Sequence, residues 1–203
     1  MEKEGVMKVF IYLTWIFLFI VGIADLFINP YRSIIWALSL AVLLFLYFRV
    51  KVPLYMHLLF SFIVLLNVFG ETIFEWYYLF IHYDKLLHLI NPVIGCLFVY
   101  HLAKNKIKDK RMLMMFCVFA VISIAIGWEI SEFGFDKLTN YGLQGVKLTD
   151  GGHFFLVGEV VMPPFDDTML DMICDVVGTM VFALVFWIKN IRNKGKRKAR
   201  KYS

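Results

Sequence analysis

Three aspartates toward the end of the chain have a spacing that suits chemistry inside a membrane. Asp167, Asp171 and Asp175 follow one another at intervals of four residues, where the last long apolar segment begins. At 3.6 residues per turn they share one helix face, and Asp175 lies roughly 12 Å further along the axis than Asp167. A carboxylate buried at that depth normally faces a bundle interior, a partner or a watery cavity. The stripe therefore predicts a polar site between helices.

Two other predicted helices carry polar residues on one face near the same end of the bundle. They are Asp84, His88 and Asn91 on one helix, and Glu129, Glu132 and Asp136 on the next. An ionised group at the centre of a bilayer costs about 2.5–3.5 kcal/mol, and less toward the surface. The cost of burying Glu129, Asp171 and Asp175 as ionised groups would be a large part of a typical free energy of unfolding of about 5–15 kcal/mol. This cost favours a functional role for the three carboxylates. We also expect Asp25 and Glu71 near this end, and close helix approach at Gly127 and Gly178.

One histidine among several carboxylates suits a divalent metal ion. We take Asp84, His88, Glu129, Asp171 and Asp175 as candidate catalytic residues, and all of these except Asp84 as candidate metal ligands. His88 with carboxylates fits Zn²⁺ or Mn²⁺, whereas carboxylates alone fit Mg²⁺ or Ca²⁺. Such a metal could activate water. Without one, close carboxylates would share protons and act as an acid–base pair. The sequence contains no HExxH, GxSxG, Walker or dinucleotide motif.

The composition is that of an integral membrane protein. Of the 203 residues 61% are hydrophobic, and the mean hydropathy is +0.73, whereas soluble domains contain about 45–50% apolar residues. The net charge of +5 does not indicate nucleic-acid binding, because the basic residues lie between and after the apolar segments. Cys96, Cys117 and Cys174 lie within apolar segments and are interpreted as core residues.

The apolar segments predict an all-α bundle of six transmembrane helices in one domain, residues 1–203. The expected spans are about 9–28, 33–48, 53–73, 84–103, 112–135 and 166–188. A glycine-rich outer loop covers 137–165, and within it 153–162 could form a short hairpin. A basic tail, 189–203, would be cytoplasmic and bind anionic lipid.

The positive charges predict that both termini face the cytoplasm. Of the 21 lysines and arginines all but four then lie on the cytoplasmic side; the four are Arg32, Lys85, Lys137 and Lys147. Among the 16 acidic residues only Glu2, Glu4 and Asp109 are cytoplasmic. The carboxylates therefore gather in the outer half of the bundle, and the candidate site would open outward.

Motifs in the last three spans resemble a known family. Asp84-Lys85-Leu86-Leu87-His88 resembles the DKxxH motif of VanZ-like bacterial membrane proteins, and residues 128–132 (WEISE) lie where that family has an ExxQ-type pair. Residues 171–178 lie at its DxxxNxxG motif, and 167–172 (DTMLDM) are similar to the DTxxDM motif of the YjdF-like branch. The resemblance extends over Tyr83 to Gly178. It implies a helical multi-pass protein of the bacterial inner membrane with a shared polar site.

Three functions are compatible with these residues. The first is an outward-facing site, metal-dependent or not, that acts on a lipid-linked or cell-envelope substrate. The second is an ion- or proton-coupled transporter of small solutes, although the inner halves of the spans offer few ionisable groups beyond His57 and His101. The third is a non-catalytic accessory protein whose polar cluster locks helices together. The lipid bilayer is the expected partner, nucleic acid is not, and the sequence leaves the oligomeric state open.

Overall fold

The computed structural model describes residues 2–139, 143–148 and 159–202, with side chains through residue 191 in the last helix. Six helices among these residues are long and apolar enough to cross a membrane, which confirms the all-α six-helix prediction. The chain forms two compact units, Met1–Trp76 and Tyr77–Ser203, and each is described by itself. That the whole chain acts as one membrane domain stays a prediction.

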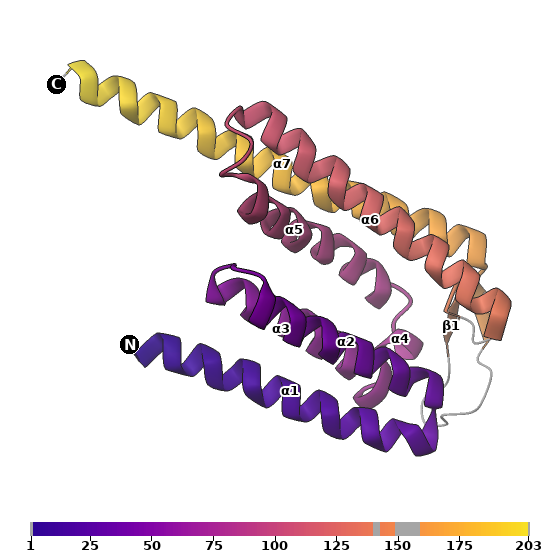
Figure 1. Ribbon diagram of the computed structural model, residues 1–203. Coiled ribbons are helices and arrows are strands. Elements are labelled where there is room, and N and C mark those ends of the chain that lie inside the picture. Colours follow the sequence, from indigo (N-terminus) through magenta and orange to yellow (C-terminus); the bar gives the residue numbers. More distant parts are fainter. Residues whose placement is uncertain (1, 140–142, 149–158, 203) are drawn as a thin grey trace. The chain divides into compact units, whose positions relative to one another are not determined.

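The first unit contains three spans (Figure 1). They are α1 (Glu2–Ile28), α2 (Pro30–Arg49) and α3 (Leu54–Val68), which continues into the π-helix η1 (Phe69–Ile73). The turn between α1 and α2 follows from Asn29-Pro30, because the Asn29 side chain accepts a hydrogen bond from the Arg32 amide and proline suits the first helical turn. The predicted spans 9–28, 33–48 and 53–73 therefore all exist, with slightly wider bounds for the first two.

A buried ion pair joins α1 to α2. Both nitrogens Nε and Nη2 of Arg32 donate to the Asp25 carboxylate, at 2.7 and 2.6 Å, and the Trp36 indole N–H donates to it at 2.8 Å. Asp25 is 1% exposed and Arg32 is 3% exposed. Asp25, which we expected near the acidic site, is thus fully engaged within its own unit. The apolar core beside it contains Leu18, Val21, Trp36, Leu43 and Val68.

The second unit is built from three long helices that pack against one another (Figure 1). They are α5 (Tyr83–Ala103), α6 (Lys110–Thr139) and α7 (Pro164–Tyr202), and the short α4 (Trp76–Leu79) lies at the boundary of the units. These helices cover the predicted spans 84–103, 112–135 and 166–188. However, α6 and α7 extend into the expected outer loop, and α7 continues through most of the expected tail. Pro164 at the first position of α7 explains where that helix begins.

Gly178 brings α7 close to α5, as predicted. A Cβ atom at this position would overlap the Leu89 carbonyl oxygen and lie 3.3 Å from the Pro92 Cβ atom. The same prediction for Gly127 was wrong, because a Cβ there would meet no described atom within 4 Å. Toward the N-terminus of α6, the buried side chains between the three helices form an apolar cluster. Its members are Cys96, Val99, Ala103, Leu113, Cys117, Val121 and Phe182.

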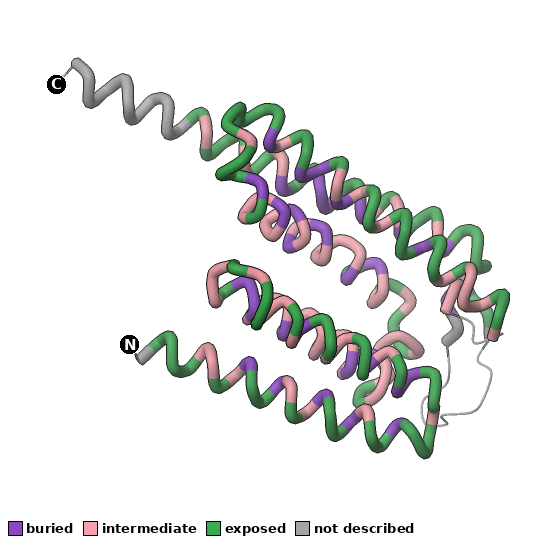
Figure 2. Tube along the Cα trace, viewed as in Figure 1, coloured by how far each residue is buried: buried purple, intermediate pink, exposed green. Residues whose placement is uncertain are grey.

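Many exposed positions on the helices carry large apolar side chains. Figure 2 shows many exposed residues along α1, α2, α6 and α7, whereas α5 is mostly buried or half-buried. On α6 the exposed residues include Phe119, Ile124 and Trp128, which are 61%, 66% and 55% exposed. Such surfaces are unfavourable in water and favourable in lipid. The pattern supports a multi-pass membrane protein.

Two short strands lie in the connection between α6 and α7. Strand β1 (Val146–Leu148) pairs antiparallel with β2 (Glu159–Met162), and Gly145, with φ of 86°, precedes β1. The expected hairpin within 153–162 is therefore displaced, since 159–162 pairs with 146–148. The stretch 149–158 lies outside the described residues.

Candidate functional site

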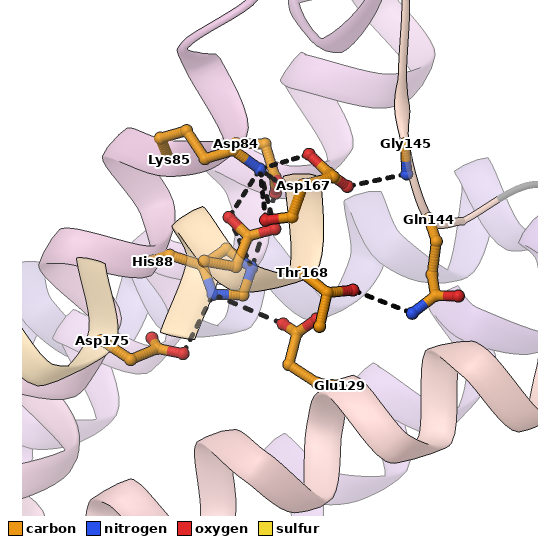
Figure 3. A network of polar contacts seen from close by, with 10 residues as sticks. Asp84, Lys85, His88, Glu129, Gln144, Gly145, Asp167, Thr168 and Asp175 are labelled. Carbon is orange, nitrogen blue, oxygen red and sulfur yellow. Dashed lines mark hydrogen bonds and ion pairs between the residues drawn. The ribbon is translucent and has the colours of Figure 1, made fainter. Parts of the chain in front are cut away.

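The site lies within the second unit, at the end where α5 and α7 begin. Lys85, in the first turns of α5, points its ammonium group at α7 (Figure 3). It forms ion pairs with Asp167, with Asp171 at 2.7 Å and with its neighbour Asp84 at 3.2 Å. Lys85 is 7% exposed. A buried lysine is stable only with such partners, so this cation fixes α5 against α7.

The aspartate stripe of α7 faces the helix bundle as its spacing predicts. Asp167, Asp171 and Asp175 are 4%, 1% and 4% exposed. The three residues lie on successive turns of α7. Asp167 and Asp171 contact Lys85, and Asp175 contacts His88, one turn further along α5. The stripe therefore spans two different environments.

His88 lies at the centre of the cluster, and each of its two ring nitrogens faces a different pair of carboxylates (Figure 3). Its Nδ1 atom lies 3.2 Å from Asp175 Oδ2 and 3.9 Å from Glu129 Oε1. Its Nε2 atom lies 3.7 Å from Asp84 Oδ1 and 3.9 Å from Asp171 Oδ1. Only the contact with Asp175 is within hydrogen-bonding distance. The imidazole thus separates two acidic environments.

Glu129 is the least satisfied member of the cluster. It is 4% exposed, and neither of its carboxylate oxygens has a hydrogen-bond partner among the described residues. A buried carboxylate without hydrogen bonds is strongly disfavoured unless it is protonated or bound to a cation. Glu129 lies ten residues before the end of α6, so it caps neither end of its own helix.

The five candidate residues are brought together, and they form two sets with the spacing of metal ligands. One set is Asp84, His88 and Asp171, the other is His88, Glu129 and Asp175, and within each set the ligand atoms lie within 4.8 Å of one another. Carboxylates outnumber cations here, since Lys85 and His88 face Asp84, Glu129, Asp167, Asp171 and Asp175. Nitrogen and carboxylate donors together suit a divalent transition metal.

The connection between α6 and α7 is fastened to the rim of the site. The Gly145 amide donates to Asp167 Oδ2 at 2.7 Å, and the Gln144 side chain donates to the Thr168 hydroxyl at 2.9 Å (Figure 3). Asp136 accepts hydrogen bonds from the amides of Leu143 and Gln144, at 2.7 and 2.8 Å. Asp136 thus orders the connection and is not one of the grouped ligands.

Sequence reasoning missed part of this arrangement. The sequence pattern gives no signal for the pairing of Lys85 with Asp167 and Asp171, and none for the contributions of Gln144 and Gly145. Asn91, expected on the same face as His88, has a buried side-chain oxygen with no hydrogen-bond partner among the described residues. Pro92 follows it inside α5 and lacks the N–H that would bond to the His88 carbonyl.

Comparison with known proteins identifies the family. The model of a family described as "Predicted membrane protein (DUF2238)" matches residues 6–192. Because this match covers nearly the whole chain, the chain belongs to that family. No curated protein and no solved structure matches the chain. The family match agrees with a multi-pass membrane protein of several apolar helices.

Proposed function

We propose that the second unit holds a divalent metal ion in its α5–α6–α7 site and uses it to act on a lipid-linked or cell-envelope substrate. The observation that carries the proposal is Glu129, a buried carboxylate. Within the part of the chain that the structure describes, neither of its oxygens has a hydrogen-bond partner, and one of them lies 3.9 Å from a histidine nitrogen. A bound cation would satisfy this carboxylate and reduce the repulsion among its neighbours.

The charge of the site supports this proposal. Lys85 and a protonated His88 together would balance only two of the five carboxylates around them. Excess negative charge inside a membrane protein is costly, and a divalent cation is the compact way to neutralise it. Asp84, with a side chain 26% exposed, lies on the more accessible part of the cluster.

The chemistry of such a site is hydrolysis. A divalent ion would supply Lewis acidity, polarising a substrate oxygen and helping water to lose a proton. A carboxylate of the cluster would accept that proton as the water oxygen bonds to the phosphorus or carbonyl carbon. The leaving group would take the proton as its own bond breaks. Asp84 and Asp171 are positioned beside His88 for these transfers.

The proposal places the site on the outer side of a bacterial inner membrane. The distribution of lysine and arginine supports that orientation. The similarity of residues 84–88 and 167–178 to VanZ-like motifs, closest to the YjdF-like branch, supports a shared site, because those residues are the ones grouped here.

Transport is less well supported than catalysis. A path for ions through the second unit needs polar groups beyond the midplane. The buried residues described in that half form mainly the apolar cluster from Cys96 to Phe182, and the hydrogen bond between Lys110 and Asn190 is exposed. A purely structural lock is also less well supported, because a lock would leave no buried carboxylate without hydrogen bonds.

The test is metal-dependent turnover by the whole protein. We would reconstitute the wild type and His88→Gln in vesicles with bacterial envelope lipids, including lipid-linked saccharides, and follow products by mass spectrometry. Wild-type protein with Mn²⁺ or Zn²⁺ should release a water-soluble product, and both chelation and His88→Gln should abolish it. Stoichiometric metal with no turnover of any envelope lipid would contradict the enzymatic part of the proposal.

A further inference from the structure

We infer that the metal ion binds on one side of His88 only, held by His88 Nδ1, Glu129 and Asp175, while Lys85 takes the place of a second cation on the opposite side. The inference rests on the proposed metal site and specifies its ligands. Asp171, one of the candidate ligands, is then the ion-pair partner of Lys85 and does not bind the metal.

The carboxylates on the Nε2 side of His88 already have partners. Both oxygens of Asp171 lie 2.7 Å from Lys85 Nζ, which donates a hydrogen bond to Oδ2 and forms an ion pair with Oδ1. Asp167 pairs with Lys85 and accepts a hydrogen bond from the Gly145 amide. Asp84 is 3.2 Å from Lys85, partly exposed, and in the first turn of α5, where the helix dipole favours a negative charge. A divalent ion here would have to compete with a lysine ammonium.

The Nδ1 side contains no such cation. Glu129 and Asp175 are each 4% exposed, and among the described residues Lys85 pairs with Asp84, Asp167 and Asp171 but with neither of them. His88 is the cationic group next to both carboxylates, and the neutral Thr168 hydroxyl lies beside Glu129. Two buried carboxylates and one imidazole nitrogen therefore converge on a place that needs positive charge.

The carboxylates on the far side of the ring would support the tautomer that a bound metal requires. Without a metal, Asp175 at 3.2 Å is the nearest acceptor for a proton on Nδ1. A cation between His88, Glu129 and Asp175 would displace that proton, and Asp84 and Asp171, at 3.7 and 3.9 Å from Nε2, would stabilise the N–H on the other nitrogen. Metal-binding histidines commonly have a carboxylate near the other ring nitrogen, which orients the ring and increases its basicity.

The spacing on the Nδ1 side is close to that of bound ligands. Metal–ligand bonds of about 2.0–2.2 Å place neighbouring donors roughly 3.0–3.5 Å apart. Nδ1 lies 3.2 Å from Asp175 Oδ2 and 3.9 Å from Glu129 Oε1, so only the glutamate has to move closer. One nitrogen and two carboxylates select Mn²⁺ or Zn²⁺ over Ca²⁺ and leave positions for water or substrate.

The experiment is Mn²⁺ titration of the full chain in lipid nanodiscs, with free Mn²⁺ measured by electron paramagnetic resonance. The wild type should bind one Mn²⁺, and pulsed spectra should show coupling to one histidine nitrogen that disappears in His88→Gln. Glu129→Gln and Asp175→Asn should each weaken binding by at least about tenfold, as losing a ligand should weaken it no less than losing an outer-shell partner. Asp84→Asn should still bind one Mn²⁺ and should weaken binding less than either ligand variant, because Asp84 acts only through the far side of the His88 ring. The matched carboxylate-to-amide control is Asp166→Asn, an exposed aspartate next to Asp167, which should bind Mn²⁺ with the wild-type affinity.

The outcomes separate the inference from the function on which it rests. Weaker Mn²⁺ binding in Asp84→Asn than in Glu129→Gln and Asp175→Asn, or wild-type affinity in those two variants, would overturn the ligand assignment while leaving a metal site in place. Binding of two ions by the wild type would overturn the role given to Lys85. No Mn²⁺ or Zn²⁺ binding by folded wild-type protein would overturn the metal site itself. The predicted binding pattern without turnover would overturn only the proposed hydrolysis. Because Asp84 is partly exposed, its variant gives a decisive result even if Glu129→Gln does not fold.

Discussion

Lys85 and Asp171 are 86 residues apart in the sequence, yet the Lys85 ammonium lies 2.7 Å from both oxygens of the Asp171 carboxylate. Both side chains are almost fully buried. The pair joins the first turns of α5 to the second turn of α7, next to the ion pair between Lys85 and Asp167. The geometry of the whole polar site depends on this connection, because His88 follows Lys85 by one turn and Asp175 follows Asp171 by one turn.

Lys85→Met should destabilise the second unit strongly. The change leaves Asp167 and Asp171 buried without their cation, and breaking a buried ion pair from one side typically costs about 3–5 kcal/mol. We expect a large decrease in the thermal unfolding midpoint of the protein in detergent. Asp84→Asn is the matched control, because this partly exposed partner should change stability by about 1 kcal/mol or less. Equal losses in the two variants would contradict the central role of Lys85.

The acidic half of the site was predictable from sequence, but its basic partner was not. The spacing of Asp167, Asp171 and Asp175 determines a shared helix face whatever the tertiary structure, so the stripe could be recognised directly. Lys85 has Asp84 beside it in sequence, and its stronger partners lie 82 and 86 residues further on. Long-range pairing depends on how helices pack, which periodicity does not encode.

The same limit explains the remaining differences in the fold. Hydropathy located all six spans, because each must be apolar over the thickness of a bilayer. It placed helix ends less well, since α7 continues as a helix beyond the apolar segment. It did not distinguish Gly178, which contacts α5, from Gly127, which has open space around it. The sequence likewise did not indicate that Arg32 would pair with Asp25, although only seven residues separate them.

Gly178→Ala should destabilise the contact between α5 and α7. The added methyl group would overlap the Leu89 carbonyl oxygen, and that oxygen belongs to a helix backbone that cannot easily move. Overpacking of this kind typically costs about 1–3 kcal/mol. Gly127→Ala is the control within the same unit, since alanine there has open space and gains about 1 kcal/mol of helix propensity.

The measurement is the unfolding midpoint of both glycine variants and the parent in one detergent. Gly178→Ala should unfold earlier than the parent, and Gly127→Ala at the same temperature or later. A stable Gly178→Ala protein would mean that α5 and α7 are further apart than the structure shows.

Asp25→Asn should destabilise the first unit. The substitution removes the charge that Arg32 and the Trp36 indole share at 2.6–2.8 Å, and it leaves a buried guanidinium unpaired. We expect a loss of about 3–5 kcal/mol, measured as an earlier unfolding transition. Glu4→Gln also removes an ion pair from α1, but its contact with Lys8 is exposed, so the transition should not move.

Asp136→Asn should loosen the segment that begins the connection between α6 and α7. Asp136 accepts the amides of Leu143 and Gln144, and an amide side chain presents one acceptor oxygen in place of two. Hydrogen exchange at residues 143–146 should become faster, whereas exchange within α5 should not change. The neighbouring exposed Lys137→Gln should leave the exchange of both segments unaltered. Protection that persists in Asp136→Asn would show that other contacts order the segment.

Cysteine labelling should show that the polar end of the second unit faces away from the cytoplasm. Lys106 and Lys137 are exposed at opposite ends of α5–α6, and the positive-inside distribution assigns Lys106 to the cytoplasm. In intact bacterial cells a membrane-impermeant maleimide should label Lys137→Cys, and it should label Lys106→Cys only after the cells are opened. The parent chain is the control for background, since Cys96 and Cys117 are buried and Cys174 is half-buried. Labelling of Lys106→Cys in intact cells would invert the topology, and the polar site would then have to act on a cytoplasmic substrate.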